Sequence, residues 1–238
     1  KPNPKYLIHC AVDQRPPKEN IANYTYTNTL IFNNLITYAK KNKVELIINL
    51  SSTEAYGDIK TNYLKEDYLS QNLNAYGKTK LISEQILHGQ KISFVNIRLP
   101  GVLCNPINKK FSRPWLCSVL NKIQRNHNIS GHNLKNKFNN VISTQEIAKF
   151  INFLIKKNIK IRETFNFAGT KPISLKNILN IAKKKLNSKS KIIEIKNKKK
   201  NSFCISTKKL EKKLQYKTQS TKKIIEKYLE NILKYKKI

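Results

Sequence analysis

Short apolar runs alternate with helical patterns over the first hundred residues of this chain. Three runs typical of buried strands cover residues 6–11, 44–50 and 92–97. Between them, apolar residues recur at helical spacing in residues 22–41 and 75–87. Strands that alternate with helices predict a parallel sheet with right-handed crossovers. We therefore predict an α/β fold containing part of a Rossmann-like, doubly wound parallel sheet.

The predicted helix over residues 75–87 has clear boundary signals. Asn74 is a candidate N-terminal cap, and Gly89 follows the last apolar residue. The apolar side chains fall at Leu81, Ile82 and Ile86. We expect that side of the helix to pack inward.

The second half of the chain has a less regular pattern. Helices are predicted over residues 114–124, 144–156, 175 to beyond 182, and 221–234. Strands are predicted over residues 164–168 and 191–195. Thr144 and Ser174 are the candidate caps of two of these helices. The Lys-rich residues 196–201 are expected to form a loop or a mobile segment.

The net charge of +33 arises from 47 basic and 14 acidic residues. Lys accounts for 42 of the basic residues, and Lys, Asn and Ile, which all have A/T-rich codons, together make up 103 of the 238 residues. Because sequence-specific recognition of nucleic acids favours Arg, a solvated lysine surface is the preferred interpretation. The alternative is a non-catalytic basic scaffold that binds RNA or an anionic surface through residues 156–238, where the excess of positive charge is +21.

Composition also limits the cellular setting. No apolar stretch approaches the roughly 18 residues of a membrane span, so no membrane contact is expected. The four cysteines (Cys10, Cys104, Cys117 and Cys204) form neither a C-x-x-C motif nor a Cys–His cluster. We therefore expect a reduced, cytoplasmic protein without a metal site. The absence of Met predicts that the sequence is processed or a fragment.

Four residues form the candidate catalytic set: Ser52, Glu54, Tyr76 and Lys80. Tyr76 and Lys80 are four residues apart on a predicted helix and therefore share a face. A nearby ammonium favours the phenolate and lowers the pKa of a Tyr, which can then act as a general acid or base. Ser52 and Glu54 follow the predicted strand at 44–50, at the carboxyl edge where parallel sheets bind ligands.

The Tyr-x-x-x-Lys spacing alone carries little information. With 11 Tyr and 42 Lys in the chain, about two such pairs are expected by chance, and two occur. The second pair, Tyr56 and Lys60, straddles Gly57 in a predicted loop, whereas Tyr76 opens a capped helix. Without further context, Tyr76 is better explained as an amphipathic ring at a helix start, and Glu54 as a solvated loop carboxylate. The alternative for Ser52 is a hydroxyl that caps the turn after the strand.

The order of the motifs supplies that context. Residues 51–58 (SSTEAYGD) and then 76–80 (YGKTK) resemble the extended short-chain dehydrogenase/reductase family, the NAD-dependent nucleotide-sugar epimerases and dehydratases. Five further segments fit the family in the same order: residues 6–11, 28–35, 98–106, 140–148 and 165–169. The resemblance covers nearly the whole chain.

The resemblance implies a role for each matching residue. Tyr76 would be the catalytic acid/base, Lys80 would hold the nicotinamide ribose and lower the pKa of Tyr76, and Ser52 would orient the reacting hydroxyl. Glu54 occupies the place of a base used by dehydratase branches. The positions that would touch the dinucleotide or support its site are Ala11, Asn28, Pro100 and Val102.

The resemblance also implies a cofactor, a substrate and an assembly. The cofactor would be NAD or NADP, and the substrate a nucleotide-linked sugar of the surface-polysaccharide precursor class. Residues 1–104 would form the remaining half of the dinucleotide-binding domain. Residues 105–238 would mainly bind substrate, with about 139–170 returning to the Rossmann core. Related proteins commonly form homodimers through helices equivalent to 22–41 and 75–88.

The chain departs from the family in its glycines. The family holds the pyrophosphate with a G-x-x-G-x-x-G turn after its first strand. None of the six glycines here lies within three residues of another, so these 238 residues contain no such turn. We expect the chain to lack the first β-α-β-α-β of the family and to bind NAD poorly by itself.

Overall fold

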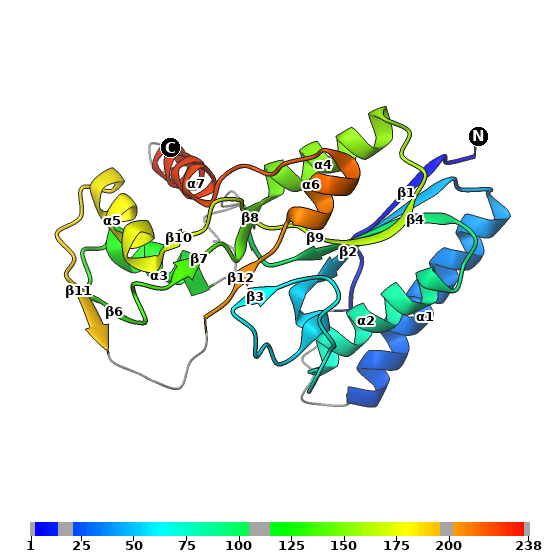
Figure 1. Ribbon diagram of the computed structural model, residues 1–238, viewed down its shortest axis with the longest axis horizontal. Helices are drawn as coiled ribbons and strands as arrows, with labels where there is room; N and C mark the ends of the chain where they lie inside the picture. The colour runs from blue at the N-terminus through cyan, green and yellow to red at the C-terminus, as the bar shows by residue number, and fades with distance from the viewer. Residues whose placement is uncertain (1–2, 14–20, 105–114, 196–201, 236–238) are drawn as a thin grey trace. The chain divides into compact units, whose positions relative to one another are not determined.

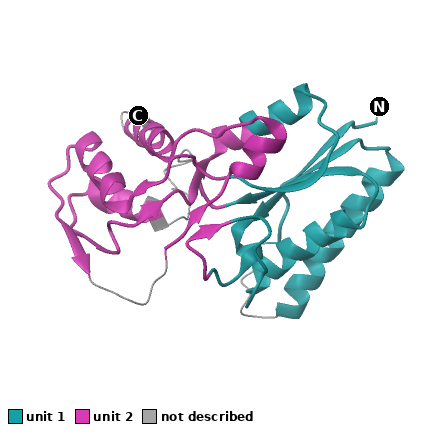
Figure 2. Cartoon of the chain, in the orientation of Figure 1, with its two compact units in different colours: residues 1–59, 65–99, 149–167 teal, residues 60–64, 100–148, 168–238 magenta. Residues whose placement is uncertain are grey.

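The computed structural model describes residues 3–13, 21–104, 115–195 and 202–235. The chain forms two compact units, which are coloured separately in Figure 2. Unit 1 consists of residues 1–59, 65–99 and 149–167. Unit 2 consists of residues 60–64, 100–148 and 168–238.

Unit 1 is built on a four-stranded parallel sheet with the order β1-β2-β4-β9. Its strands are β1 (Tyr6–His9), β2 (Leu46–Ser52), β4 (Ser93–Leu99) and β9 (Arg162–Asn166). The helical elements are α1 (Ile21–Lys41), the 3₁₀ turn η1 (Thr53–Tyr56), α2 (Ala75–His88) and, from Lys149, the C-terminal part of α4 (Thr144–Lys156). In Figure 1, α1 and α2 run along one face of this sheet and α4 along the other. The predicted α/β fold with a parallel sheet is confirmed.

The hydrophobic pattern places the core of unit 1 between α1, α2 and the sheet. Ile47 of β2 and Phe94 of β4 are fully buried against α1, which contributes Phe32, Ile36 and Ala39 at helical spacing. Burying side chains of this size contributes roughly 1.5–3 kcal/mol each before the entropy cost of ordering them. This packing fixes α1 and α2 against the strands whose ends carry the candidate site.

Unit 2 is made of short strands and helices. Its strands are β3 (Tyr63–Leu64), β5 (Gly101–Leu103), β6 (Ile129–His132), β7 (Lys137–Phe138), β8 (Val141–Ser143), β10 (Ile173–Ser174), β11 (Ile192–Ile195) and β12 (Cys204–Ile205). Its helices, besides the start of α4, are α3 (Trp115–Gln124), α5 (Leu175–Lys185), α6 (Lys208–Leu214) and α7 (Thr221–Tyr235). The strands pair two by two, antiparallel in β7–β10 and parallel in β3–β12, β5–β8 and β6–β11.

Several predicted boundaries need correction. The helix expected from Thr144 is capped by the preceding residue, because the Ser143 hydroxyl accepts a hydrogen bond from the Glu146 N–H at 3.3 Å. The strand expected at 164–168 begins and ends two residues earlier, as β9. Ser174 caps α5 as predicted, accepting from the Asn177 N–H at 3.2 Å. The predicted loop at 196–201 and the predicted helix start at Pro114 lie outside the described residues.

The buried side of α2 differs from the prediction. Leu81, Ile82 and Ile86 are only half-buried. The side chains that are buried in the helix beyond its first turn are mostly polar: Thr79, Lys80, Ser83, Glu84 and Leu87. The helix therefore presents a polar stripe to the sheet, where Lys80, Ser83 and Glu84 form hydrogen bonds with residues of β2 and β4.

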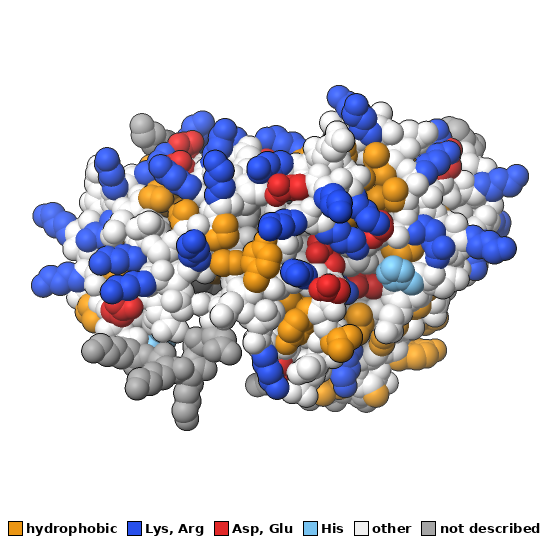
Figure 3. Space-filling view, in the orientation of Figure 1, with side chains coloured by type: hydrophobic (Ala, Val, Ile, Leu, Met, Phe, Trp, Pro, Cys, Tyr) orange, Lys and Arg blue, Asp and Glu red, His pale blue; other side chains and the backbone are white. Residues whose placement is uncertain are grey.

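The surface is dominated by lysine. Figure 3 shows Lys and Arg side chains distributed over the visible face of each unit, with carboxylates among them. A bilayer crossing would need a longer and more apolar helix than any that the described residues form. In the same residues, no three His, Cys, Asp or Glu side chains gather in a way that could hold a metal ion.

Candidate active site

The site in unit 1 forms where β2 ends and α2 begins. Ser52 is the last residue of β2, and its hydroxyl accepts a hydrogen bond from the Glu54 N–H at 3.1 Å, which starts η1. Asn74 caps α2 as predicted, since its side-chain oxygen accepts from the Gly77 N–H at 2.7 Å. These two local caps place Ser52 and Tyr76 on adjoining backbone turns.

Gly77 allows α2 to approach η1 closely. A Cβ atom at this position would lie 2.2 Å from the Glu54 carbonyl oxygen, far inside van der Waals contact. The Asn74 side-chain amide also donates to Glu54 Oε2 at 2.7 Å. The exposed Glu54 carboxylate is thus held at the entrance of the helix.

Tyr76 lies half-buried beside Ser52. Burial raises the pKa of the Tyr76 phenol, the charges of Tyr24 and Glu54 raise it further, and a hydrogen bond with the Ser52 side chain lowers it in part. The sequence-based prediction of a lowered pKa is therefore wrong for this structure. Burial is the largest contribution to this pKa, and the Lys80 ammonium, 5.5 Å from the centre of the Tyr76 ring, is not among the charges that shift it.

Lys80 is directed into the protein and only 6% exposed. Its ammonium donates to the Leu50 carbonyl oxygen at 2.9 Å. Burial lowers the pKa of Lys80, while the charges of Cys10 and Glu84 raise it. An ammonium has three donors, and the described residues take one of them in this hydrogen bond, so the group is suited to hold hydroxyl oxygens of a ligand.

His9, at the end of β1, is a buried titratable group near Lys80. It is 6% exposed and packs edge-on against Phe32 at 4.9 Å between ring centres. Burial, with a smaller contribution from the Lys80 charge, lowers the pKa of His9 to about 4. The imidazole is therefore neutral at physiological pH.

This shift predicts a loss of stability in acid. The ordinary pKa of 6.5 applies to the unfolded chain, so the unfolded state takes up the His9 proton first as the pH falls. The contribution of His9 to stability is present above about pH 6.5 and is lost as the pH falls toward 4. In His9→Gln, we expect the urea midpoint to fall less between pH 7.5 and pH 5 than in the parent. The exposed His127→Gln is the control, and equal pH dependence in His9→Gln and the parent would contradict the assignment.

Asn28 has a local structural role. Its side-chain oxygen accepts from the Asp13 N–H at 2.9 Å, and its amide donates to the Tyr24 carbonyl at 2.9 Å. These bonds fasten the segment after β1 to α1, and the exposed Ala11 lies on that segment. Contact of Ala11 and Asn28 with a dinucleotide stays a prediction.

Pro100 and Val102 belong to unit 2. Val102 lies in β5 opposite Ile142 of β8, and both Pro100 and Val102 are half-buried. The structure thus brings Ser52, Glu54, Tyr76 and Lys80 together in unit 1. The cofactor roles of Pro100 and Val102 stay predictions.

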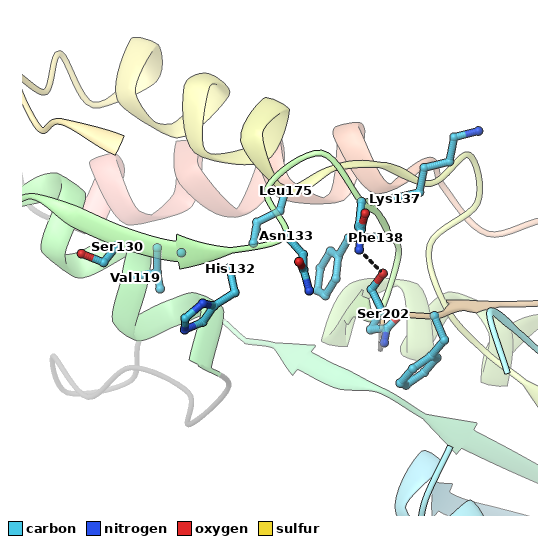
Figure 4. A pocket seen from close by; sticks show the side chains of 12 residues that line it. Val119, Ser130, His132, Asn133, Lys137, Phe138, Leu175 and Ser202 are labelled. Atoms are coloured by element: carbon cyan, nitrogen blue, oxygen red, sulfur yellow. Dashed lines mark hydrogen bonds between the residues drawn. The ribbon is translucent and has the colours of Figure 1, made fainter. Parts of the chain in front are cut away.

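Unit 2 contains a pocket that sequence reasoning missed. Its volume is about 390 Å³, and Figure 4 shows the rings of His132 and Phe138 and the amide of Asn133 lining it. Asn136 donates to the Ser202 hydroxyl at 2.7 Å in the same wall. The buried side-chain oxygen of Asn140, another lining residue, has no hydrogen-bond donor among the described residues. Only the Asn-rich composition of residues 128–140 could have indicated this site.

The sequence model described as the NAD dependent epimerase/dehydratase family matches residues 1–171. No curated protein matches the chain. Among solved structures, WbmG from Bordetella bronchiseptica in complex with NAD and UDP has 16% identity and a TM-score of 0.79, covering 98% of this chain and 74% of that one.

Two further structures have the same fold. UDP-glucose 4-epimerase from Thermotoga maritima, solved with UDP-glucose, has 16% identity and a TM-score of 0.76, over 98% of this chain and 78% of that one. RMD from Pseudomonas aeruginosa, complexed with NADPH, has 15% identity and a TM-score of 0.76, over 96% and 81% of the two chains.

Proposed function

The chain belongs to the NAD dependent epimerase/dehydratase family, and we propose that it acts on a nucleotide-linked sugar of the surface-polysaccharide precursor class. The observation that carries this proposal is the arrangement of Ser52, Tyr76 and Lys80. A half-buried phenol meets a hydroxyl at the end of β2, and a buried ammonium lies one helical turn further along α2. This set is suited to moving a proton to or from a sugar hydroxyl.

The residues present fit one end of the cofactor. The Lys80 ammonium, with donors beyond its bond to Leu50, and the Tyr76 hydroxyl would hold the nicotinamide ribose of NAD or NADP. Ala11, Asn28 and the Pro100–Val102 stretch would support the dinucleotide. When bound, the cofactor supplies a hydride acceptor and donor. For the pyrophosphate these 238 residues offer no glycine-rich turn.

Tyr76 would be the residue that exchanges a proton with the sugar hydroxyl. Because burial holds the pKa of Tyr76 above its ordinary value, the phenol is protonated in the free protein and must lose its proton before it accepts one from a sugar hydroxyl. Ser52 stabilises the phenolate through its hydrogen bond and orients the reacting hydroxyl. The Lys80 charge favours the same phenolate form.

Glu54 would extend this chemistry to a C–H bond. Its carboxylate is exposed and is oriented by the Asn74 amide. A carboxylate at this position can take a proton from the carbon next to an oxidised sugar carbon, which is the step that leads to elimination of water. The presence of Glu54 favours a dehydratase within the proposed class.

The direct test is conversion of a substrate panel. The protein is incubated with NAD or NADP and with UDP-, dTDP- and GDP-linked hexoses, and products are identified by NMR. We expect epimerised, dehydrated or reduced sugar from at least one donor. If no member of the panel is altered with either cofactor, the proposal fails.

The pocket of unit 2 would take the nucleotide part of the substrate. The rings of Phe138 and His132 offer flat surfaces for a base, and the Asn140 oxygen offers an acceptor for an N–H or a ribose hydroxyl. Filling the site would satisfy a buried acceptor to which no described residue donates a hydrogen bond.

A binding measurement tests this assignment. By calorimetry, we expect Asn140→Leu to weaken binding of uridine diphosphate by about tenfold, because a hydrogen bond to a buried group contributes about 1 kcal/mol or more. Lys135→Ala, an exposed change outside the pocket, is the control. Unchanged affinity in Asn140→Leu would refute a role for Asn140 in nucleotide binding.

The outer face of α1 supports a homodimer. Three large side chains that share one side of this helix are more than 40% exposed: Tyr26, Leu30 and Tyr38. A second copy of the chain pairing through α1 and α2 would cover them. We expect Tyr26→Glu combined with Leu30→Glu to halve the mass measured by light scattering, while Lys43→Glu, beyond the helix end, leaves it unchanged. A parent protein that is already monomeric would contradict this assembly.

A further inference from the structure

The end of β2 holds α2 through three consecutive contacts. The α2 residues involved are spaced by four and therefore form one stripe on the helix. The three pairs are Ser52 with Tyr76, Leu50 with Lys80, and Ser51 with Glu84. The first two pairs belong to the proposed catalytic set, and the third extends it by one helical turn.

Glu84 is a carboxylate in the interior, 2% exposed. It accepts a hydrogen bond from the Ser51 hydroxyl at 2.5 Å. It also forms a forked ion pair with Arg98, with Nη2 to Oε2 at 2.6 Å and Nε to Oε1 at 3.0 Å. Arg98 comes from β4, directly opposite Ser51 in the strand register. One carboxylate thus ties α2 to two central strands.

The Arg98 end of the pair is fixed as well. Its guanidinium lies 4.3 Å from the centre of the Tyr56 ring. The Tyr56 hydroxyl donates to Asn166 Oδ1 at 2.7 Å, on β9. Arg98 Nη1 donates to the Glu66 carbonyl at 3.3 Å. The pair therefore has one geometry, set by η1 and three strands.

Stability alone does not explain why Glu84 and Arg98 form an ion pair in the interior. Replacing such a pair with apolar residues of similar size is often neutral or stabilising. Glu84, however, has a second cationic neighbour, because Lys80 lies one turn away on the same stripe. The Lys80 ammonium is itself buried, which disfavours its charged form, and the Glu84 charge counteracts that effect.

The other titratable groups that face Lys80 do not replace Glu84. His9, on β1, is neutral at physiological pH and so carries no charge that could support the cation. Cys10, which follows β1, has a thiol whose pKa is raised by burial, so it is largely uncharged at neutral pH. Tyr76 is protonated in the free protein. Glu84 is thus the charged carboxylate that supports the Lys80 ammonium within the described residues.

We propose that Glu84 and Arg98 form a positioning pair that keeps the Lys80 ammonium charged and directed at the end of β2. Arg98 orients the carboxylate, and Glu84 acts on Lys80. What Lys80 then holds rests on the proposed function, but the effect of the pair on Lys80 does not.

The test measures the titration of Lys80 directly. The protein is labelled with a trace of acetic anhydride at a series of pH values, and labelling of each lysine is read by peptide mass spectrometry. In Glu84→Gln, we expect the labelling midpoint of Lys80 to move to lower pH by about one unit. The midpoint of Lys78, an exposed lysine two residues earlier, stays in place. A purely structural role would lower stability without moving Lys80.

Two variants keep the test decisive. Glu45→Gln removes a carboxylate that pairs with Lys5 and Lys160 at the surface of unit 1, and it leaves the Lys80 midpoint unchanged. Glu84→Gln with Arg98→Met removes both buried charges and is read if the single variant does not fold. In this double variant, we expect the labelling midpoint of Lys80 to move to lower pH by a smaller amount, because the Arg98 charge that repels Lys80 is lost together with Glu84.

An unchanged Lys80 midpoint in a folded variant overturns the proposal. The measurement uses neither NAD nor a sugar. If the protein converts no member of the substrate panel, the proposed function is wrong, but the proposed effect of Glu84 and Arg98 on Lys80 is unaffected.

Discussion

We expect Tyr76→Phe to remove most of the turnover of the protein while leaving the fold in place. The variant keeps the half-buried ring and loses only the hydroxyl that bonds Ser52. General acid–base catalysis by a positioned side chain typically contributes about 10²–10⁴-fold, so we expect kcat to fall by at least about 100-fold. Stability changes by about 1 kcal/mol at most, because one partly buried hydrogen bond is lost. Turnover on the best substrate of the panel and the urea midpoint are the two measurements.

The matched control is Tyr26→Phe. Tyr26 lies on α1 and is 67% exposed, so removing its hydroxyl affects neither turnover nor stability. Near-normal turnover in Tyr76→Phe would refute the catalytic assignment. Loss of the fold in Tyr76→Phe would also count against it, since the hydroxyl would then be structural.

Gly77→Ala damages both stability and turnover. The added methyl would meet the Glu54 carbonyl oxygen at 2.2 Å and its carbon at 2.9 Å, and these are backbone atoms that cannot move aside alone. Forcing an extra carbon into a closely packed contact costs about 1–3 kcal/mol. The start of α2 must shift away from η1, which moves Tyr76 relative to Ser52. We expect a lower urea midpoint and a fall in kcat of about 10-fold or more in the folded fraction.

Gly89→Ala is the control on the same helix. Gly89 ends α2 in a right-handed conformation, and a methyl there would meet its nearest neighbour at an ordinary 3.5 Å. The change is expected to leave turnover unaltered and to stabilise by up to about 1 kcal/mol, because Ala restricts the unfolded chain. Equal midpoints for the two variants would show that the approach of α2 to η1 is not tight.

The sheet and helices of unit 1 were predictable because burial dictates their pattern. β2 reads as an unbroken apolar run, Leu46 to Ile48, as expected of a central parallel strand covered on both faces. The family resemblance was equally accessible, since its motifs follow one another in order along the chain, and it is confirmed. The division into residues 1–104 and 105–238 stays a prediction.

The buried side of α2 was not predictable from hydrophobicity. Lys80 and Glu84 belong to residue types that are almost never fully buried unless they are paired. Their partners, Leu50 and Arg98, are 30 and 14 residues away in sequence, and no periodicity reveals such pairing. The direction of the Tyr76 pKa shift was missed for a related reason, because burial of the phenol depends on tertiary packing.

The pocket of unit 2 could not be predicted from the sequence, because the strands that line it are short. β7 has two residues, and β6 has four, so neither shows the alternation that identifies a strand. His132 and Phe138 end these two short strands. Only the folded chain brings them beside Ser202, 64 residues beyond Phe138 in sequence.

β1 occupies the outer position of the unit 1 sheet, next to β2 on one side. Within the described residues no strand pairs with its other side, and Ile8 is 43% exposed there. The unpaired backbone N–H and C=O groups of such an edge strand can form hydrogen bonds with an extended segment of another chain. We therefore expect β1 to pair with a strand from another chain or to promote aggregation of the protein. A peptide that pairs with β1 should reduce that aggregation.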